Sequence, residues 1–407
     1  MNLRIARYID RWLGPLLCLL LYGLARLLGR RLPALGATTP PTGPIPAPRR
    51  LLGIKFYGLG NIVMLLPTLR ALRAAFPDAE IDFLTLVDNA ALLEGSGCVR
   101  QVLTVDVKGR RRFLRSILAL LPALRRGGYD TVLDFEQFVK LSGLFAHLTG
   151  ARECVGLNTE GQSRAWLYTT RVAYTDSDHT VDIFQRMVAP FGVRPAANTG
   201  TTLGITTAAR ERIRTLLAGA GAGGRSPLVV MHVGNGASYN RLDLKRWDAA
   251  RFAAVADALI ERHGVTVAFT GKGDEEKTLV ADTLRHMQRP AVDTCDRLGI
   301  GELVALVAEA DFVVANDTAV MHLAAAVGTP VVALFGPTSP ASYGPRGARD
   351  LIFYKQLYCS PCLSNYNLKL SRCTNNVCMQ RITVDEVLAG IESRYFTMPR
   401  SAAAGEQ

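Results

Sequence analysis

The stretch "VVANDTAVMHLAAAVGTPVVALFGPTSP" occupies residues 313–340. Its first apolar run ends at Asn316, Asp317 and Thr318, and His322 follows within an alanine-rich segment. This order predicts a strand, a polar turn and a helix that opens on that turn. The first N–H groups of a helix and the positive end of its dipole favour a bound anion. The stretch therefore predicts either a seat for an anionic ligand such as a diphosphate, or a capped helix whose His322 packs between domains.

The rest of the chain repeats this alternation. From Leu51 onwards, short apolar runs alternate with longer amphipathic stretches, which is typical of β-α-β units in a parallel sheet. The predicted strands are 51–56, 80–86, 100–106, 130–136, 227–233, 265–271, 311–316 and 330–336. The predicted helices are 61–76, 179–192, 246–262 and a last one that opens at 383–386. We expect an α/β protein with two Rossmann-like, doubly wound domains that face an interdomain cleft, where ligands lie at the carboxyl ends of the strands.

The length of 407 residues exceeds what one ordinary core accommodates, so two domains are expected. A hydrophobic content of 49% and a charged content of 20% exclude a disordered chain and a fully membrane-embedded one. The predicted segments are an N-terminal helix (1–32), a proline-rich linker (33–50), a first domain (51–200), a second domain (201–396) and a disordered tail (397–407).

The N-terminal segment carries much of the formal charge of +12, because residues 1–50 hold eight Arg and one Asp. Between Leu13 and Leu28 the only charged residue is Arg26, and Pro15 is expected in the first helical turn. A helix of this length spans about 24 Å, less than a bilayer core of ~30 Å. We expect a helix that lies in the cytoplasmic leaflet with its arginines facing anionic lipid. A tilted single span, a signal peptide and a plain core helix are the alternatives.

Glycine-rich and basic stretches mark further strand ends. Gly58 and Gly60, in the turn 57–61, allow a ligand to approach the backbone, although a tight strand-to-helix turn would also need them. No third glycine completes a dinucleotide fingerprint. Lys245 follows a second-domain strand, where a cation can neutralise a leaving phosphate. Glu276, or its neighbour Glu275, is a candidate for holding ribose hydroxyls. The alternative for these residues is a solvated helix start.

The late cysteines form a cluster in the sequence. Two residues lie between Cys359 and Cys362 and four between Cys373 and Cys378, which is close to the spacing of structural zinc ligands. Disulfides or unmodified thiols are the alternatives. No nucleic-acid motif accompanies the positive charge, so we expect no nucleic acid as a partner.

Several of these motifs together resemble glycosyltransferase family 9, the ADP-heptose:lipopolysaccharide heptosyltransferase family. The resemblance covers roughly residues 51–395. It is carried by 313–338, by "GLGNIVMLLPTLRALRAAFP" (58–77), by "KRW" (245–247), by "TGKGDEE" (270–276) and by the cysteine pairs. It implies a GT-B fold and a metal-independent, inverting transfer without a catalytic cofactor. The donor, a nucleotide-linked heptose or related sugar, would bind the second domain and the acceptor the first.

The resemblance also assigns residues. The donor diphosphate would lie at the helix start formed by Thr318, Ala319, Val320 and Met321, beside Asp317 and His322. The family usually has glycine at the position of Ala319, a modest change where backbone N–H groups make the contact.

A second departure concerns the general base. The family's proposed base is an Asp that follows the glycine turn, and this chain has Asn61 there. An amide does not accept the proton of an acceptor hydroxyl. Three explanations remain: another carboxylate is the base, with Asp134 and Glu136 as candidates; Asn61 only positions the acceptor; or the protein is inactive.

The sequence thus predicts a cytoplasmic enzyme at the surface of the inner membrane. It would move a sugar, with heptose the first candidate, from an ADP- or other nucleotide-linked donor to a lipopolysaccharide-type or other lipid-linked saccharide. The alternatives are a sugar-nucleotide epimerase on the same architecture and a catalytically inactive GT-B scaffold at the membrane.

Overall fold

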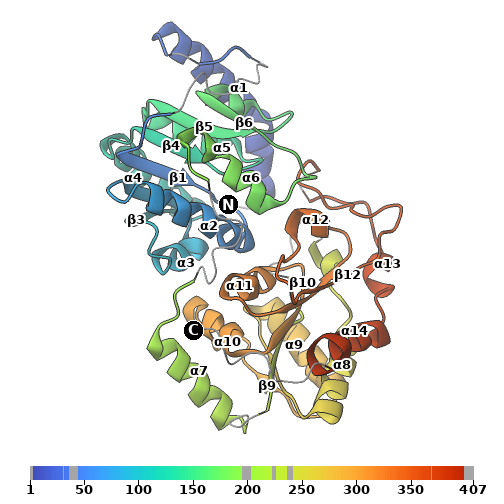
Figure 1. The fold of residues 1–407 in the computed structure, drawn as a ribbon. Helices are drawn as coiled ribbons and strands as arrows, with labels where there is room; N and C mark the ends of the chain where they lie inside the picture. Colours follow the sequence, from blue (N-terminus) through green and yellow to red (C-terminus); the bar gives the residue numbers. More distant parts are fainter. Residues whose placement is uncertain are drawn as a thin grey trace. The chain divides into compact units, whose positions relative to one another are not determined.

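The computed structural model describes residues 3–30, 32–35, 45–194, 203–221, 226–235, 242–367 and 369–397. The centre of the predicted proline-rich linker, Gly236 and the predicted tail beyond residue 397 lie outside the described residues. The chain divides into two compact units, Met1–Thr202 and Leu203–Gln407. Each unit holds one parallel sheet of six strands with helices packed on it (Figure 1).

Unit 1 contains the sheet β3-β2-β1-β4-β5-β6, in which every neighbouring pair is parallel. Its strands are β1 (Arg50–Ile54), β2 (Glu80–Leu86), β3 (Gln101–Val105), β4 (Thr131–Asp134), β5 (Glu153–Asn158) and β6 (Thr170–Ala173). Its helices are α1 (Leu3–Leu27), α2 (Leu59–Ala75), α3 (Ala90–Glu94), α4 (Arg110–Arg126), α5 (Lys140–Leu148) and α6 (Thr180–Arg186). The strand order reverses between β1 and β4, and the carboxyl ends beside such a switch point are where α/β sheets bind ligands.

The core of unit 1 explains how its helices are held. Leu120 and Leu124 of α4 and Phe145 of α5 pack with Leu52 and Ile54 of β1, all at most 4% exposed. Helices α4 and α5 therefore share one face of the sheet, and the apolar run of β1 lies beneath them.

Helix α1 begins ten residues before the predicted apolar run and packs against α5 and the short 3₁₀ helix Ser163–Leu167. The expectation that Pro15 lies in the first turn was wrong, because Pro15 lies in the middle of α1. Proline there removes one helical hydrogen bond, and the packing of α1 against α5 and the 3₁₀ helix, where Cys18 is fully buried, offsets that loss. Among the helices of the described residues, none is long and apolar enough to cross a membrane.

Unit 2 contains the sheet β12-β11-β10-β7-β8-β9, again parallel throughout. Its strands are β7 (Leu228–His232), β8 (Thr266–Phe269), β9 (Val292–Asp293), β10 (Phe312–Asn316), β11 (Val331–Phe335) and β12 (Leu351–Tyr354). Its helices are α7 (Thr207–Gly219), α8 (Ala249–His263), α9 (Asp274–His286), α10 (Ile300–Glu309), α11 (Ala319–Val327), α12 (Pro340–Tyr343), α13 (Val377–Gln380) and α14 (Val384–Ile391). The switch point of this sheet lies between β7 and β10.

The predicted α/β class is confirmed, and each of the eight predicted strands is present within two residues of its predicted ends. Strands β5, β6, β9 and β12 were not predicted. The predicted helix 179–192 is shorter than expected, because α6 ends at Arg186 and a 3₁₀ turn follows at Ala189–Phe191.

Candidate functional site

The site in unit 2 is organised by Asn316, the last residue of β10. Its side-chain amide donates to the carbonyl oxygens of Val233 (3.0 Å) and Gly234 (3.2 Å), just beyond β7. Its Oδ1 accepts the N–H of Trp247 at 3.1 Å. Because Asn316 is fully buried, these three bonds tie the two strand ends of the switch point to the segment that precedes α8.

Asp317 and Lys245 lie in contact at the carboxyl ends of β7 and β10, as expected if both belong to one binding site. The Lys245 Nζ lies 2.6 Å from Asp317 Oδ2, and the Thr338 hydroxyl donates to the same oxygen at 2.7 Å. Burial by itself would raise the pKa of Asp317, but Lys245, with help from His322 and Thr338, holds that pKa below its usual value. Asp317 is therefore ionised, and it fixes the ammonium group of Lys245 beside the start of α11.

The start of α11 has unused donors. Thr318 occupies the N-cap position, yet its side chain makes no capping hydrogen bond. Among the described residues its buried hydroxyl has no hydrogen-bond partner. A buried hydroxyl without a partner costs about 1–3 kcal/mol. A ligand oxygen that accepts from this hydroxyl and from the first N–H groups of α11, at Ala319, Val320 and Met321, would remove that cost.

Glu276 lies at the neighbouring strand end, where β8 leads into α9. Its Oε2 accepts the N–H of Lys272 at 2.8 Å, and its Oε1 lies 3.4 Å from His232 Nε2. A Cβ atom on Gly234 would lie 2.2 Å from Glu276 Oε1, so only glycine permits this approach. The carboxylate is thus held against the backbone of the same β7 end that Asn316 contacts.

The two cations of the "KRW" stretch differ in their partners. Whereas Lys245 contacts Asp317, Arg246 donates to the side chain of Asn235 at 2.6 Å and pairs with Glu275. Of the two glutamates considered for ribose, Glu275 therefore has an arginine partner, whereas Glu276 lies beside His232.

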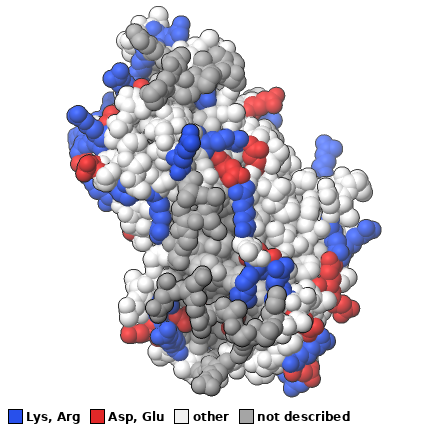
Figure 2. Space-filling view, in the orientation of Figure 1, with Lys and Arg blue, Asp and Glu red and all other residues white. Residues whose placement is uncertain are grey.

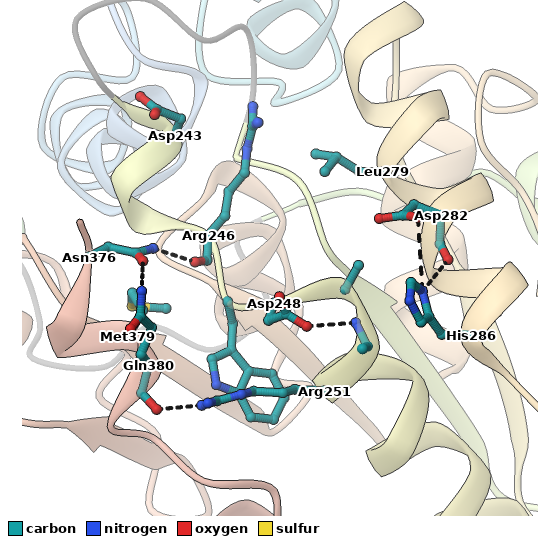
Figure 3. Close-up of a pocket in the computed structure, with 13 residues that line it drawn as sticks. Asp243, Arg246, Asp248, Arg251, Leu279, Asp282, His286, Asn376, Met379 and Gln380 are labelled. Atoms are coloured by element: carbon teal, nitrogen blue, oxygen red, sulfur yellow. Dashed lines mark hydrogen bonds and ion pairs between the residues drawn. The ribbon is translucent and has the colours of Figure 1, made fainter. Parts of the chain in front are cut away.

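A hollow of about 660 Å³ opens beside this site, between the start of α8, the outer side of α9 and α13 (Figure 3). Its polar side chains are engaged with one another or with the backbone: Arg251 donates to the carbonyl of Gln380, and Asp248 accepts the N–H of Ala250. None of the residues from Asp317 to His322 lines it. The hollow therefore shares Arg246 and Trp247 with the site but does not include the start of α11.

In unit 1 the helix after the glycine turn begins at Leu59, two residues earlier than predicted. Gly58 has a φ of +88°, which only glycine adopts readily, and α2 starts directly after it. Gly60 and Asn61 therefore lie in the first turn of the helix. The Asn61 amide bends back to donate to the carbonyl oxygen of Tyr57 at 3.3 Å.

Glu136 lies beneath this turn. Its Oε1 accepts the N–H groups of Phe56 (2.7 Å) and Tyr57 (2.9 Å), and its Oε2 lies 3.2 Å from Lys55 Nζ. Burial opposes ionisation, but Lys55 and the two N–H groups overcome it and lower the pKa of Glu136. Glu136 is thus an ionised carboxylate, 3% exposed, that holds the turn in place.

Asp134 is fully enclosed as well. It accepts hydrogen bonds from the Tyr168 hydroxyl and from the N–H of Glu136, and Arg164 Nη1 lies 3.7 Å away. Burial raises its pKa. The structure brings both candidate bases next to the glycine turn but gives each of them internal partners. Whether either removes a proton from an acceptor stays a prediction.

The four late cysteines do not form a metal site in the part of the chain that the structure describes, where no group of three or more His, Cys, Asp or Glu side chains is arranged to hold an ion. Cys359 is exposed and Cys378 is buried. Burial raises the pKa of Cys378 to about 11.

Sequence reasoning missed three contributors to these sites. The sequence places Asn316 only in the polar turn ahead of a helix, and no local pattern singles out Thr338. Lys55 was not considered, because its partner lies about 80 residues further along the chain and no local pattern connects them.

The chain is similar to known proteins. The family model described as glycosyltransferase family 9 (heptosyltransferase) matches residues 117–370. Lipopolysaccharide heptosyltransferase 3 of Escherichia coli K12 is 26% identical over 290 residues, which cover 70% of this chain and 82% of that protein.

Two solved structures are similar in fold. A glycosyl transferase family 9 structure from Veillonella parvula has a TM-score of 0.70 at 21% identity and covers 85% of this chain and 96% of that one. The structure of E. coli ADP-heptose LPS heptosyltransferase II has a TM-score of 0.64 at 18% identity, covering 84% and 98%. The two six-stranded sheets thus match the fold of heptosyltransferase structures.

Proposed function

The chain belongs to glycosyltransferase family 9, the heptosyltransferase family, and is a glycosyltransferase; from this premise we propose that it transfers a heptose to a lipopolysaccharide-type saccharide. The donor would be ADP-heptose or another nucleotide-diphosphate sugar. The names of the relatives support this substrate class, since one is a lipopolysaccharide heptosyltransferase and another an ADP-heptose LPS heptosyltransferase.

The observation that carries the proposal is the unused donor set at the start of α11. The Thr318 hydroxyl and the first N–H groups of α11 lie at the start of that helix, and the neighbouring Asp317 binds the Lys245 ammonium. When the bond between the sugar and the diphosphate breaks, negative charge grows on the leaving phosphate. Donors already oriented toward that charge stabilise the transition state most strongly. The transfer would be inverting and would need no metal ion, with Glu276 accepting hydrogen bonds from the ribose.

For the acceptor we propose that Asn61 orients the attacking hydroxyl. Asp134 and Glu136 then act by holding the turn rather than by taking the proton, because both have internal partners, and the hydroxyl proton passes to solvent water as its oxygen bonds to the sugar. A second reading, an inactive binding protein, is favoured by one observation, the amide of Asn61 at the position of the family's base.

We propose further that α1 lies on the cytoplasmic surface of the inner membrane, as a lipid-linked acceptor requires. Trp12, Leu16, Leu20, Leu24 and Leu27 follow one another at helical spacing, and each is more than half exposed. Such a stripe suits the interface between headgroups and acyl chains.

Helix α4 supplies a second surface of the same kind. Leu114 and Leu118 are exposed, and Lys and Arg side chains gather along the side of unit 1 where α4 lies (Figures 1 and 2). The arginines of α4 are Arg110, Arg111, Arg112, Arg115, Arg125 and Arg126. Near an anionic leaflet each basic side chain contributes about 1 kcal/mol.

The test is turnover of the full chain with ADP-heptose and a native lipid-linked oligosaccharide extract, in which nucleotide release and acceptor mass are both measured. A heptose-sized mass gain supports transfer. The variants Asn61→Asp, Asp134→Asn and Glu136→Gln run in parallel, and loss of transfer with unchanged folding in either carboxylate variant would identify that carboxylate as the base. Donor binding without transfer, rescued by Asn61→Asp, would support the inactive binding protein. Donor conversion without an acceptor would indicate an epimerase.

A structural zinc on Cys359, Cys362, Cys373 and Cys378 is kept as a separate proposal, which rests on their spacing alone. Metal analysis of the purified protein tests it. One zinc per chain that is lost in Cys362→Ser would support it, and equal metal content in both proteins would refute it.

A further inference from the structure

Asp10, the one acidic residue among the first fifty, does not face solvent in the manner expected of a basic membrane helix. It reaches from α1 to the first turn of α5. Its Oδ1 accepts the N–H of Lys140 at 2.9 Å and the N–H of Leu141 at 3.2 Å. Its Oδ2 lies 3.6 Å from Lys140 Nζ. A carboxylate of the chain itself thus occupies the anion-binding end of a nine-residue helix.

A second cation, Arg164, lies near the first turn of α5, and some of its N–H donors have no hydrogen-bond partner among the described residues. Arg164 is fully buried and lies against the first turn of α5, with Nη1 3.3 Å from the Ser142 hydroxyl. Among the described residues its Nε and Nη2 have no hydrogen-bond partner. A buried guanidinium normally uses all of its donors, because each unpaired one is costly. A ligand oxygen that reached Nε and Nη2, which carry three N–H groups between them, would remove this cost.

The charged residues near the first turn of α5 are consistent with a bound anion. Lys140 and Arg164 carry two positive charges, and Asp134 and Asp10 carry two negative ones. The neighbouring Lys55 and Glu136 neutralise each other. If Asp10 is removed, a net positive charge remains in a largely buried place at the carboxyl edge of the sheet, next to the glycine turn.

The surroundings of Asp10 also disfavour its ionised form. Burial raises its pKa even though Lys140, two N–H groups and Arg164 all act to lower it. The ionised carboxylate is therefore less favourable here than in water.

We propose that the first turn of α5, with Lys140 and Arg164, is a binding seat for an acidic group of the acceptor, a phosphate or carboxylate, and that Asp10 of α1 occupies this seat until the acceptor arrives. The inference deepens the proposed function and rests on it for the identity of the ligand. Helix α1 then couples membrane binding to acceptor binding, because the same helix carries the apolar stripe proposed to enter the membrane.

Close packing of α1 against the Lys140 side chain supports this inference. A Cβ atom on Gly14, one turn after Asp10, would lie 2.6 Å from the Cδ and 3.1 Å from the Cβ of Lys140. Helix α1 can therefore approach Lys140 this closely only with glycine at that position, so the contact depends on a specific small residue.

The experiment titrates inorganic phosphate into the full chain, with ADP saturating unit 2, and follows the backbone amide signals of Lys140 and Leu141 by NMR. Asp10→Ala empties the seat, whereas Asp10→Asn keeps a hydrogen-bond acceptor but no charge. Asp88→Ala, which removes an exposed carboxylate paired with Lys108, is the matched control. If Asp10 occupies the seat about 99% of the time, emptying it tightens the apparent phosphate affinity by up to about 100-fold.

The expected result is at least a tenfold tighter phosphate affinity in Asp10→Ala, seen at the two amides and abolished in Asp10→Ala with Lys140→Met. If Asp10 is only a helix cap, Asp10→Ala loses stability, Asp10→Asn does not, and neither binds phosphate more tightly; that result overturns the proposal. Should Asp10→Ala fail to fold, Gly14→Val, which pushes α1 away while keeping Asp10, must show the same gain.

A kinetic arm identifies the source of the anion. With native acceptor, Asp10→Ala should lower the acceptor KM and leave the donor KM unchanged, and phosphatase treatment of the acceptor should remove this difference if the group is a phosphate monoester. An effect of phosphatidylglycerol vesicles in place of the acceptor would assign the anion to a lipid headgroup and contradict the acceptor assignment. The phosphate titration needs no turnover, so a failure of the transfer assay leaves its outcome readable.

Discussion

Replacing Lys245 by methionine tests the donor site most directly. The ammonium lies 2.6 Å from Asp317 Oδ2, and the two side chains are 13% and 6% exposed. Methionine keeps most of the length of the side chain and removes its charge. A charge-assisted hydrogen bond to a diphosphate contributes about 1.5–3 kcal/mol. Because ~1.4 kcal/mol corresponds to a factor of ten, ADP should bind about 10- to 100-fold more weakly.

The same change should also destabilise unit 2. It leaves the buried Asp317 without its cation, a loss of about 3 kcal/mol by analogy with broken buried ion pairs. In the unmutated protein the lowered pKa of Asp317 means that the pair stabilises the fold above the ordinary carboxyl range, and that this stabilisation is lost as the pH falls through the lowered pKa. Without Lys245, burial dominates and raises the pKa, so the variant should regain stability relative to the unmutated protein between pH 7 and pH ~4.

Calorimetric titration with ADP and urea unfolding at pH 7 and pH 5 measure the two effects. Lys355→Met is the matched control, because its partner Glu386 lies 2.8 Å away but both side chains are about one-third exposed. An exposed pair contributes about 0–1 kcal/mol, and ADP affinity should not change. Unaltered ADP affinity in Lys245→Met, with a stability loss no larger than that of the control, would refute the assignment.

Four further predictions follow from particular contacts. Glu276→Gln should reduce the preference for ADP over 2′-deoxy-ADP by about tenfold, the value of one charged hydrogen bond, in competition binding. Gly234→Ala should do the same by displacing that carboxylate, since its Cβ would lie 2.2 Å from Oε1, and a crystal structure of the variant checks the displacement. Glu136→Gln should lower the free energy of unfolding by about 3 kcal/mol, measured in urea, because its lysine partner stays buried and charged. Iodoacetamide should modify the exposed Cys359 well before Cys378, whose pKa is raised to about 11, as mass spectrometry of timed samples would show.

The strands that the sequence predicts are those with uninterrupted apolar runs. "PLVVMHV" and "DFVVAN" are buried on both faces, as the centre of a parallel sheet requires. Strand β5 was missed because "ECVGLN" contains a charge, a glycine and an amide, and β12 was missed because it lies at the sheet edge and is only partly buried. Edge strands need fewer apolar residues, so their pattern in the sequence is weaker.

The site residues that the sequence predicts are likewise those that a local pattern marks. Asp317, Thr318 and Lys245 were found because each follows a strand, and strand ends in a parallel sheet share one edge. The partnership of Asp10 with Lys140 was out of reach, because it joins residues 130 positions apart through a helix that the sequence alone suggested was directed at lipid. Local patterns show where polar groups gather. They do not show which of those groups satisfy one another.

The two units differ in how far the polar groups at their switch points satisfy one another. Both sheets have the same strand order about a switch point, and both place charged residues there. At β1 and β4, Lys55 pairs with Glu136, and Asp134 accepts from Tyr168. Arg164 there has idle donors too, but Asp10 already occupies the neighbouring helix start. At β7 and β10, by contrast, the buried Thr318 hydroxyl and the first turn of α11 have donors to spare within the described residues.

An anion gains most where donors are idle, since no internal bond must first be broken. The diphosphate is therefore expected in unit 2, whereas an anion that binds unit 1 must displace Asp10. Binding there is consequently weaker and can be regulated by whatever moves α1. If phosphate bound unit 1 of the unmutated chain as tightly as it binds the Asp10→Ala variant, this reasoning from satisfied and unsatisfied donors would fail.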